Sequence, residues 1–167
     1  MLNKQSKLLK TGSKKGKTLS NPENHLPAHH FKLVKVKRGL SGLGLFAAEP
    51  IKKGELIIEY IGNILTKAEA DKIMTNQYLF DVSRNKTIDG SPRWNTARYC
   101  NHACEDAANA ESEIKKGRVF MRAIKPIQEG EEIVYDYGEE FVQEYILPYG
   151  CNCKAAKHSY GASAPVK

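Results

Sequence analysis

Short apolar runs separated by glycine and charged residues dominate the chain from residue 31 onward. Six of these runs are rich in β-branched and aromatic side chains and are bounded by turn-forming residues, which is typical of strands. They are FKLVKV (31–36), LGLFAA (43–48), ELIIEYIG (55–62), QYLFDV (77–82), RVFMRAI (118–124) and EEIVYDY (131–137). Most of the domain is therefore predicted to be strand and loop.

Two segments have the pattern of helices instead. In LTKAEADKIMT (65–75), Thr66 and Glu69 have the spacing of a capping box, and apolar residues follow at helical spacing. A second short helix is predicted over EEFVQEYI (139–146), before Pro148 ends it. Helices are thus expected to be a minority at the edges of a β-rich body.

A small pattern occurs twice, in IKKGE (51–55) and IQEGEE (127–132). Each copy places a Gly-Glu turn before an apolar strand. Nothing else around the two copies matches, so we interpret them as similar turns and not as an internal repeat.

The length and composition of the chain suit one compact domain, since 167 residues with 41% hydrophobic content can fill a single core. No run approaches the roughly 18 apolar residues of a membrane span, and the N-terminal segment lacks the apolar stretch of a secretory signal. We therefore expect a soluble, intracellular protein without membrane contact. It would be cytoplasmic or chromatin-associated, and nuclear if it is eukaryotic or a secreted effector. The four cysteines are expected to be thiols or metal ligands.

The net charge of +7 is concentrated at the N-terminus. Residues 1–17 contain six lysines and no acid, and without them the chain would carry +1. We predict a disordered basic tail over residues 1–25, a main domain over 26–147 and a short C-terminal Cys/His segment over 148–167. The tail is either a solubilising leader, which we prefer, or a source of weak attraction to nucleic acid.

The opposite charge imbalance occurs in EGEEIVYDYGEEFVQE (129–144), which has seven acidic residues and no basic one. Such a run is either a solvated charged face or a surface that attracts a lysine-rich partner.

The segment RYCNHAC (98–104) is the first candidate for chemistry. Cys100, His102 and Cys104 alternate, so on a strand they would share one face and could bind one metal ion. They could equally be core residues, because cysteine is among the most buried residue types.

The segment SGLGLFA (41–47) is the second candidate. Gly42 and Gly44 flank Leu43, which suits a tight loop whose backbone comes close to a ligand. A dinucleotide-binding turn would need a third glycine and a following helix, and this segment has neither.

Taken in order, SGLGLFA, EYIG, YLFDV, IDG, ARYCNHAC and GEEIVYDYG, followed by CNC, resemble the motifs of the SET-domain protein lysine methyltransferases. The resemblance covers about residues 31–158 and rests mainly on the order of the motifs. It implies a mainly β SET fold of small curved sheets with few short helices. In that fold a C-terminal pseudoknot brings Asn101 and Tyr137 to one site.

The resemblance also implies an activity, namely S-adenosylmethionine-dependent methylation of lysine in a protein. Because the acidic run 129–144 flanks Tyr137, we expect a basic substrate, such as a histone, a histone-like protein or another nucleic-acid-associated protein. Tyr137 would be the catalytic tyrosine, and Tyr135 and Tyr78 would line the lysine channel; each alone could also be a core tyrosine. Many members have Phe where Tyr135 stands, which implies mainly monomethylation, or dimethylation.

The cofactor would lie between the glycine loop and the Asn-His turn. In the family, the Asn side chain helps to hold the amino-acid end, and the backbone of the Asn-His pair recognises the adenine. The implied cofactor-binding residues are Ser41, Gly42, Leu43, Tyr78, Arg98, Asn101, His102 and Asn152.

One structural zinc is implied as well. Family members with a post-SET segment bind zinc through the cysteine after Asn-His and a terminal Cys-x-Cys-x4-Cys. Here the tail reads CNCKAAKH, so Cys104, Cys151, Cys153 and His158 would form a closed Cys3His site. Cys100 would remain in the core.

The chain departs from the family pattern in NHACEDAAN (101–109), which lacks the serine and the proline and has two extra residues before its last asparagine. The sequence leaves two other functions open. One is a non-catalytic SET-like module that binds a peptide or chromatin. The other is a small zinc hydrolase, which is disfavoured because it needs an open metal position. His25, His29 and His30 are interpreted as surface residues.

Overall fold

The computed structural model describes residues 29–73 and 76–163. The predicted basic tail, His25 and the last two residues of the first predicted helix lie outside these residues. The strands are β1 (Val34–Gly39), β2 (Gly42–Ala47), β3 (Leu56–Tyr60), β4 (Asn63–Leu65), β5 (Leu79–Ser83), β6 (Lys86–Asp89), β7 (Asn101–His102), β8 (Ala110–Lys115), β9 (Arg118–Ala123) and β10 (Val134–Tyr135). The helices are α1 (Lys67–Ala70), the 3-10 helix η2 (Thr96–Tyr99), and α2 (Glu139–Phe141), which continues as the π-helical turn η3 (Val142–Ile146).

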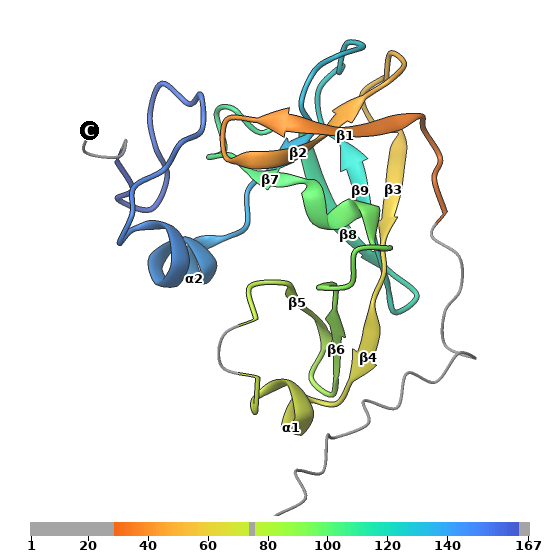
Figure 1. Ribbon diagram of the computed structural model, residues 1–167, viewed down its shortest axis with the longest axis vertical. Coiled ribbons are helices and arrows are strands. Elements are labelled where there is room, and N and C mark those ends of the chain that lie inside the picture. The colour runs from red at the N-terminus through yellow and green to blue at the C-terminus, as the bar shows by residue number, and fades with distance from the viewer. Residues whose placement is uncertain (1–28, 74–75, 164–167) are drawn as a thin grey trace, which may run out of the picture.

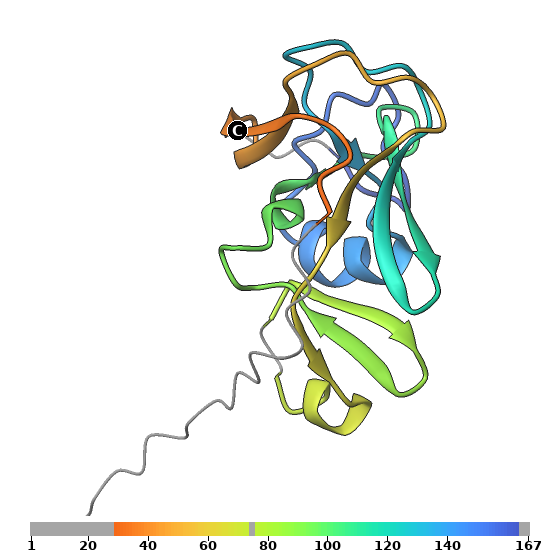
Figure 2. The same cartoon turned by 90° about the vertical axis from the view of Figure 1, so that its right-hand side faces the viewer.

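The strands form three small sheets, which confirms the prediction of a mainly β fold. Their orders are β1-β2, β3-β9-β8-β10-β7 and β4-β6-β5. The sheet β4-β6-β5 lies with α1 at the bottom of the molecule in both views, and α2 lies beside the C-terminal segment in Figure 1 (Figures 1 and 2). Among the described residues, no helix has the length and apolar character needed to cross a membrane.

Strand β10 joins segments that are far apart in sequence. It lies between β7 and β8 and runs parallel to both, with Val134 opposite Asn101 and Tyr135 opposite His102. The buried side chain of Asn109 extends this pairing, because its Oδ1 accepts from the Val134 N–H at 2.9 Å. The Asn-His and Asp-Tyr segments are therefore neighbours, as the resemblance implies.

The two Gly-Glu turns pair with each other. Ile51 and Ile127 form an antiparallel bridge, with N–H to O distances of 2.8 and 2.9 Å. In each turn the glutamate after the glycine accepts a hydrogen bond from the backbone N–H three residues earlier. Gly54 and Gly130 have φ values of +88° and +85°, a conformation that favours glycine. The repeated pattern is thus turn chemistry, as predicted.

Helix α1 is shorter than predicted. Its capping box is confirmed, since the Thr66 N–H donates to Glu69 Oε2 at 2.9 Å and the Glu69 N–H donates to Thr66 Oγ1 at 3.3 Å. The helix nevertheless ends at Ala70, its one buried residue, and Ile73 is exposed. A helix this short gains stability mainly from an apolar face packed on the core, and the apolar residue described after Ala70, Ile73, is not part of such a face.

A partly buried ion pair joins β3 to β9. Arg118 Nε lies 2.6 Å from Glu59 Oε1, and Arg118 Nη2 lies 2.5 Å from Glu59 Oε2. The Glu59 side chain is 5% exposed and the Arg118 side chain is 34% exposed. The two partners therefore differ in what their loss would cost. Loss of Arg118 leaves a buried carboxylate without its partner, whereas loss of Glu59 leaves a guanidinium that reaches water.

We expect Arg118→Ala to lower the free energy of unfolding by about 3 kcal/mol, because it strands the Glu59 carboxylate. Urea denaturation of the purified chain measures the change. Arg122→Ala is the matched control, since Arg122 bonds Glu113 in a more exposed pair on the same strand. Its cost should stay near 1 kcal/mol. Equal costs for the two variants would contradict the proposed role of burial.

Candidate active site

A cavity of about 750 Å³ lies where β5, β7, β10, η2, α2 and the C-terminal segment meet. Most of the predicted cofactor and tyrosine residues line it. They are Ser41, Leu43, Tyr78, Arg98, Asn101, His102, Tyr135, Tyr137 and Asn152. Gly42 is not among the lining residues. It lies at the turn that connects β1 to β2, where its φ is +99°. Its two neighbours, Ser41 and Leu43, do line the cavity.

Aromatic rings form the inner wall of the cavity. The ring of Tyr137 lies 4.7 Å from that of Tyr135 and 4.8 Å from that of Phe141, edge-on to the latter. The Tyr137 hydroxyl donates to the Cys100 carbonyl at 2.7 Å. Burial raises the pKa of Tyr135 and of Tyr137 well above the ordinary tyrosine value, so both hydroxyls are neutral. The Tyr137 oxygen keeps its lone pairs for another contact.

Tyr78 is held from two sides. Its carbonyl accepts from the Tyr60 hydroxyl at 2.9 Å, and the Arg98 guanidinium lies over its ring at 4.2 Å. Tyr60 also lines the cavity, although the sequence analysis did not assign it to the site. A Cβ on Gly90 would lie 2.1 Å from the Tyr60 hydroxyl. The tyrosine of EYIG and the glycine of IDG are therefore a matched pair.

The side chain of Asn101 connects the glycine loop to β10. Its Nδ2 donates to the Leu43 carbonyl at 3.1 Å and to Glu132 Oε1 at 2.8 Å. From the sequence alone, Glu132 is only one of seven acidic residues in a charged run. The close packing of its carboxylate against Gly44 is a structural signal that no spacing rule reveals.

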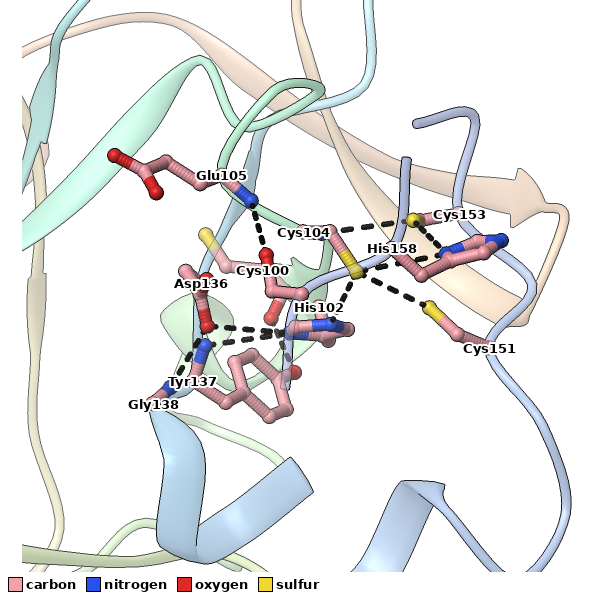
Figure 3. Close-up of polar contacts among 11 residues, drawn as sticks. Cys100, His102, Cys104, Glu105, Asp136, Tyr137, Gly138, Cys151, Cys153 and His158 are labelled. Atoms are coloured by element: carbon pink, nitrogen blue, oxygen red, sulfur yellow. Dashed lines mark hydrogen bonds and ion pairs between the residues drawn. The ribbon is translucent and has the colours of Figure 1, made fainter. Parts of the chain in front are cut away.

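His102 lies between Tyr137 and the cysteines (Figure 3). Its Nδ1 accepts from the Tyr137 N–H at 3.3 Å, and its Nε2 lies 3.6 Å from Cys104 Sγ. Burial lowers the pKa of His102, which favours the neutral ring. With Nδ1 as acceptor, the ring hydrogen is on Nε2 and faces the sulfur.

The four predicted metal ligands come together beside His102, with Cys104 and Cys151 buried and the other two half-buried (Figure 3). Cys104 Sγ lies 3.9 Å from Cys151 Sγ and 3.5 Å from His158 Nδ1, and Cys153 Sγ lies 3.4 Å from the same nitrogen. Tetrahedral zinc with ordinary bond lengths separates two sulfurs by about 3.8 Å and a sulfur and a nitrogen by about 3.6 Å. The donor set and its spacing therefore fit zinc. Cys100 is buried outside this cluster, and burial raises its pKa to about 12.

The acidic run does not form one face. Glu129 belongs to the turn whose Gly130 N–H donates to the Ala47 carbonyl, and it does not line the cavity. Glu139 begins α2, two residues before Phe141, which does line it. His29 and His30 are exposed, as predicted.

The sequence model of the SET domain matches residues 42–138. The chain is 31% identical over 137 residues to the histone-lysine N-methyltransferase ASHH3 of Arabidopsis thaliana, a match that covers 76% of this chain and 37% of that protein. It is 34% identical over 128 residues to the human histone-lysine N-methyltransferase 2D, covering 70% of this chain and 2% of that protein. The chain thus spans about a third or less of the length of these curated relatives.

Solved structures agree with the sequence match. One is the Polycomb Repressive Complex 2 of Chaetomium thermophilum, as a humanized mutant with a bound inhibitor; the TM-score is 0.56 and the identity 31%, over 65% of this chain and 15% of that one. Another is the same complex in an autoinhibited conformation bound to S-adenosylmethionine, with a TM-score of 0.55 and 30% identity, over the same shares of the two chains. The family match covers more than half of the sequence, its motifs meet at one cavity, and the chain belongs to the SET-domain family.

Proposed function

We propose that this protein is an S-adenosylmethionine-dependent protein lysine N-methyltransferase. The observation that carries the proposal is the single cavity lined both by the tyrosines around Tyr137 and by Leu43, Asn101 and Asn152. The first set suits a lysine side chain, and the second suits a polar cofactor. The histone-lysine methyltransferases among the relatives, and a solved relative with bound S-adenosylmethionine, support the same activity.

When bound, S-adenosylmethionine would supply a methyl group on a sulfonium sulfur; a neutral lysine amine would attack the methyl carbon in line, so that the N–C bond forms as the C–S bond breaks and its electrons return to the leaving sulfur. Free lysine has a pKa of about 10.4, so the site must favour the neutral amine. The aromatic walls do so by excluding water, which lowers the pKa of an amine. The same walls hold the amine in one orientation, which removes part of the entropic barrier.

Tyr137 is proposed as the catalytic tyrosine. Its hydroxyl hydrogen is used by the Cys100 carbonyl, so the oxygen offers lone pairs to the positively polarised methyl group as it moves. Because its raised pKa keeps it neutral, it stabilises by its dipole and does not remove the lysine proton. Tyr135 and Tyr78 complete the walls.

The remaining residues are proposed to bind the cofactor. The backbone of Ser41 and Leu43 and the Asn101 side chain would hold its polar end, and the backbone of His102 would face the adenine. Asn152 would close the cavity from the C-terminal segment. Arg98 would act by keeping Tyr78 in place through the stacking contact.

We propose that Cys104, Cys151, Cys153 and His158 would hold one structural zinc, and that the described part of the predicted segment 148–167, up to residue 163, forms a post-SET-like segment around it. A closed Cys3His set supplies no open position for a substrate, so the metal would fix the chain and take no part in the chemistry. Cys151 and Asn152 both line the cavity, so the same segment would help to shape the cofactor site.

The proposed substrate is a lysine-rich protein such as a histone tail, which would place the enzyme at chromatin. The support is the names of the relatives and the exposed acids of α2 beside the cavity. The basic N-terminal tail, with its predicted attraction to nucleic acid, lies outside the described residues.

The direct test incubates the purified chain with methyl-labelled S-adenosylmethionine and core histones, and locates the label by mass spectrometry. Label on lysine is the expected result. Binding of the cofactor without transfer to any protein would indicate a non-catalytic module instead, and hydrolysis that a chelator stops would indicate a metal hydrolase.

Tyr135→Phe is expected to raise the methylation state of the product. A tyrosine hydroxyl at this position can hold a water in the space that a second or third methyl group needs, and phenylalanine frees that space. Mass spectrometry of a lysine peptide should therefore show mainly monomethyl, with some dimethyl, product for the unchanged chain, and more of the higher states for the variant. Abundant trimethyl-lysine from the unchanged chain at low enzyme concentration would refute the assignment.

Glu139→Lys is expected to raise KM for a lysine-rich peptide several-fold, about the effect of one lost attraction near the surface, and to raise it less at high salt. Glu129→Lys makes the same charge change in the same acidic run, away from the cavity, and should leave KM within about twofold. Steady-state kinetics at two salt concentrations measures both. Equal effects of the two variants would show that only net charge matters.

A further inference from the structure

We propose that Glu132 is a positioning residue, which turns the Asn101 amide so that its oxygen faces the amino-acid end of S-adenosylmethionine. The inference rests on the proposed function, since it names a ligand of the same cavity. It concerns a carboxylate that takes no part in the chemistry and acts only through its neighbour.

The orientation of the Asn101 amide follows from its two partners. A carboxylate and a backbone carbonyl are both acceptors, so the group that faces them must be the amide nitrogen. Nδ2 has two hydrogens, and both are used, one by the Leu43 carbonyl and one by Glu132 Oε1. Within the described part of the chain, the amide oxygen is the group left for a ligand.

This orientation selects the chemistry of the ligand. An amide oxygen accepts hydrogen bonds and suits an ammonium group, whereas an amide nitrogen would suit a carboxylate. The amino-acid end of S-adenosylmethionine carries both groups. The geometry therefore points to its ammonium as the partner of Asn101.

The carboxylate of Glu132 is fixed by a cradle of two glycines. A Cβ on Gly39 would lie 2.6 Å from Glu132 Oε1, and a Cβ on Gly44 would lie 2.2 Å from it, so the carboxylate lies directly against both glycines. The Glu132 backbone is tied as well, because its carbonyl accepts from Asn109 Nδ2 at 2.8 Å and the next residue, Ile133, donates to the Leu45 carbonyl at 2.7 Å. A side chain held in this way can set the direction of its neighbour.

The test compares two ligands by calorimetry, with the full chain. S-adenosylhomocysteine has the amino-acid end, and 5′-methylthioadenosine lacks it. Glu132→Ala should weaken binding of the first about tenfold, the effect of one lost hydrogen bond to a charged group, and leave binding of the second within about twofold. Glu132→Gln keeps an acceptor oxygen for Asn101 and should restore most of the affinity. Glu129→Ala, an exposed glutamate of the same run, should change neither ligand.

If Glu132→Ala does not fold, a second variant can still test the inference. Gly39→Ala leaves Glu132 in place, but its added Cβ would crowd the Glu132 carboxylate, so it should cause the same selective loss. In steady-state kinetics either change should raise KM for S-adenosylmethionine and leave KM for the peptide unchanged.

Three outcomes would overturn the inference. Equal weakening of both ligands would indicate a general packing defect, and unchanged affinities would show that Asn101 keeps its orientation alone. If the unchanged chain bound neither S-adenosylmethionine nor its product, the proposed function itself would fail, and the inference with it.

Discussion

Tyr137→Phe is expected to lower methyl transfer by about 10²–10³-fold, the usual cost of removing one group that stabilises developing charge in a closed site. The ring would stay in its place, since it is packed against Tyr135 and Phe141. The change removes only the hydroxyl, whose hydrogen bonds the Cys100 carbonyl and whose oxygen faces the methyl group in the proposed complex. Affinity for S-adenosylhomocysteine should remain within about twofold, so the loss falls on kcat.

One matched variant and one stability measurement separate this effect from general damage. Tyr149→Phe removes the same atom from a residue that is 79% exposed and should leave the rate unchanged. Thermal unfolding shows whether the Tyr137 variant is folded, since the lost bond to the Cys100 carbonyl costs about 1 kcal/mol. A folded variant that transfers methyl groups at the original rate would remove Tyr137 from the chemistry.

Strands could be predicted from the sequence where a segment is rich in β-branched and aromatic residues, even for β1, whose side chains are mostly exposed. β2, β3 and β9 bury alternate or consecutive residues, and their segments have the composition of strands. β8 (Ala110–Lys115) was missed because its sequence, AESEIK, is polar and most of its side chains are exposed. It forms because it pairs with β9 along six residues, and backbone pairing leaves no mark on composition.

The residues of the candidate site also fall into two groups, those that could be assigned from the sequence and those that could not. The Asn-His and Asp-Tyr motifs and the Cys/His set could be assigned from their order along the chain, and the structure brings them together. Glu132 could not, because a carboxylate in a run of acids has the pattern of a solvated surface. Asn109 was noted only for its altered spacing, yet its amide replaces strand hydrogen bonds. These roles depend on contacts between residues 20 to 60 positions apart, which no local pattern records.

The proposed metal cluster and the proposed catalytic tyrosine are joined by one residue. His102 accepts from the Tyr137 N–H and faces Cys104 Sγ through its other nitrogen. Such contacts around a metal ligand orient both the ligand and the group behind it. Loss of the metal should therefore disturb two places at once, the C-terminal segment and the position of Tyr137.

Cys153→Ser is expected to remove bound zinc, which the unchanged chain should hold at one ion per chain by elemental mass spectrometry. Apart from the cluster, the described part of the segment after Pro148 is tied to the domain by contacts such as the Glu105 N–H to Ser159 Oγ at 3.2 Å. Without the metal we expect it to detach and to become sensitive to protease, because metal binding supplies the folding free energy of small Cys/His segments. Affinity for S-adenosylhomocysteine should fall about tenfold or more, as the segment takes Cys151 and Asn152 away from the cavity.

Cys100→Ala is the matched control, because Cys100 is buried but lies outside the cluster. It should keep one zinc per chain and an intact C-terminal segment, even if packing loss lowers its stability. Removing zinc from the unchanged chain with a strong chelator should reproduce the protease sensitivity of Cys153→Ser, and adding zinc back should reverse it. If the metal-free chain is cleaved no faster than the zinc-bound chain, the segment is held by its own packing. The four ligands are then not what keeps the segment at the cavity.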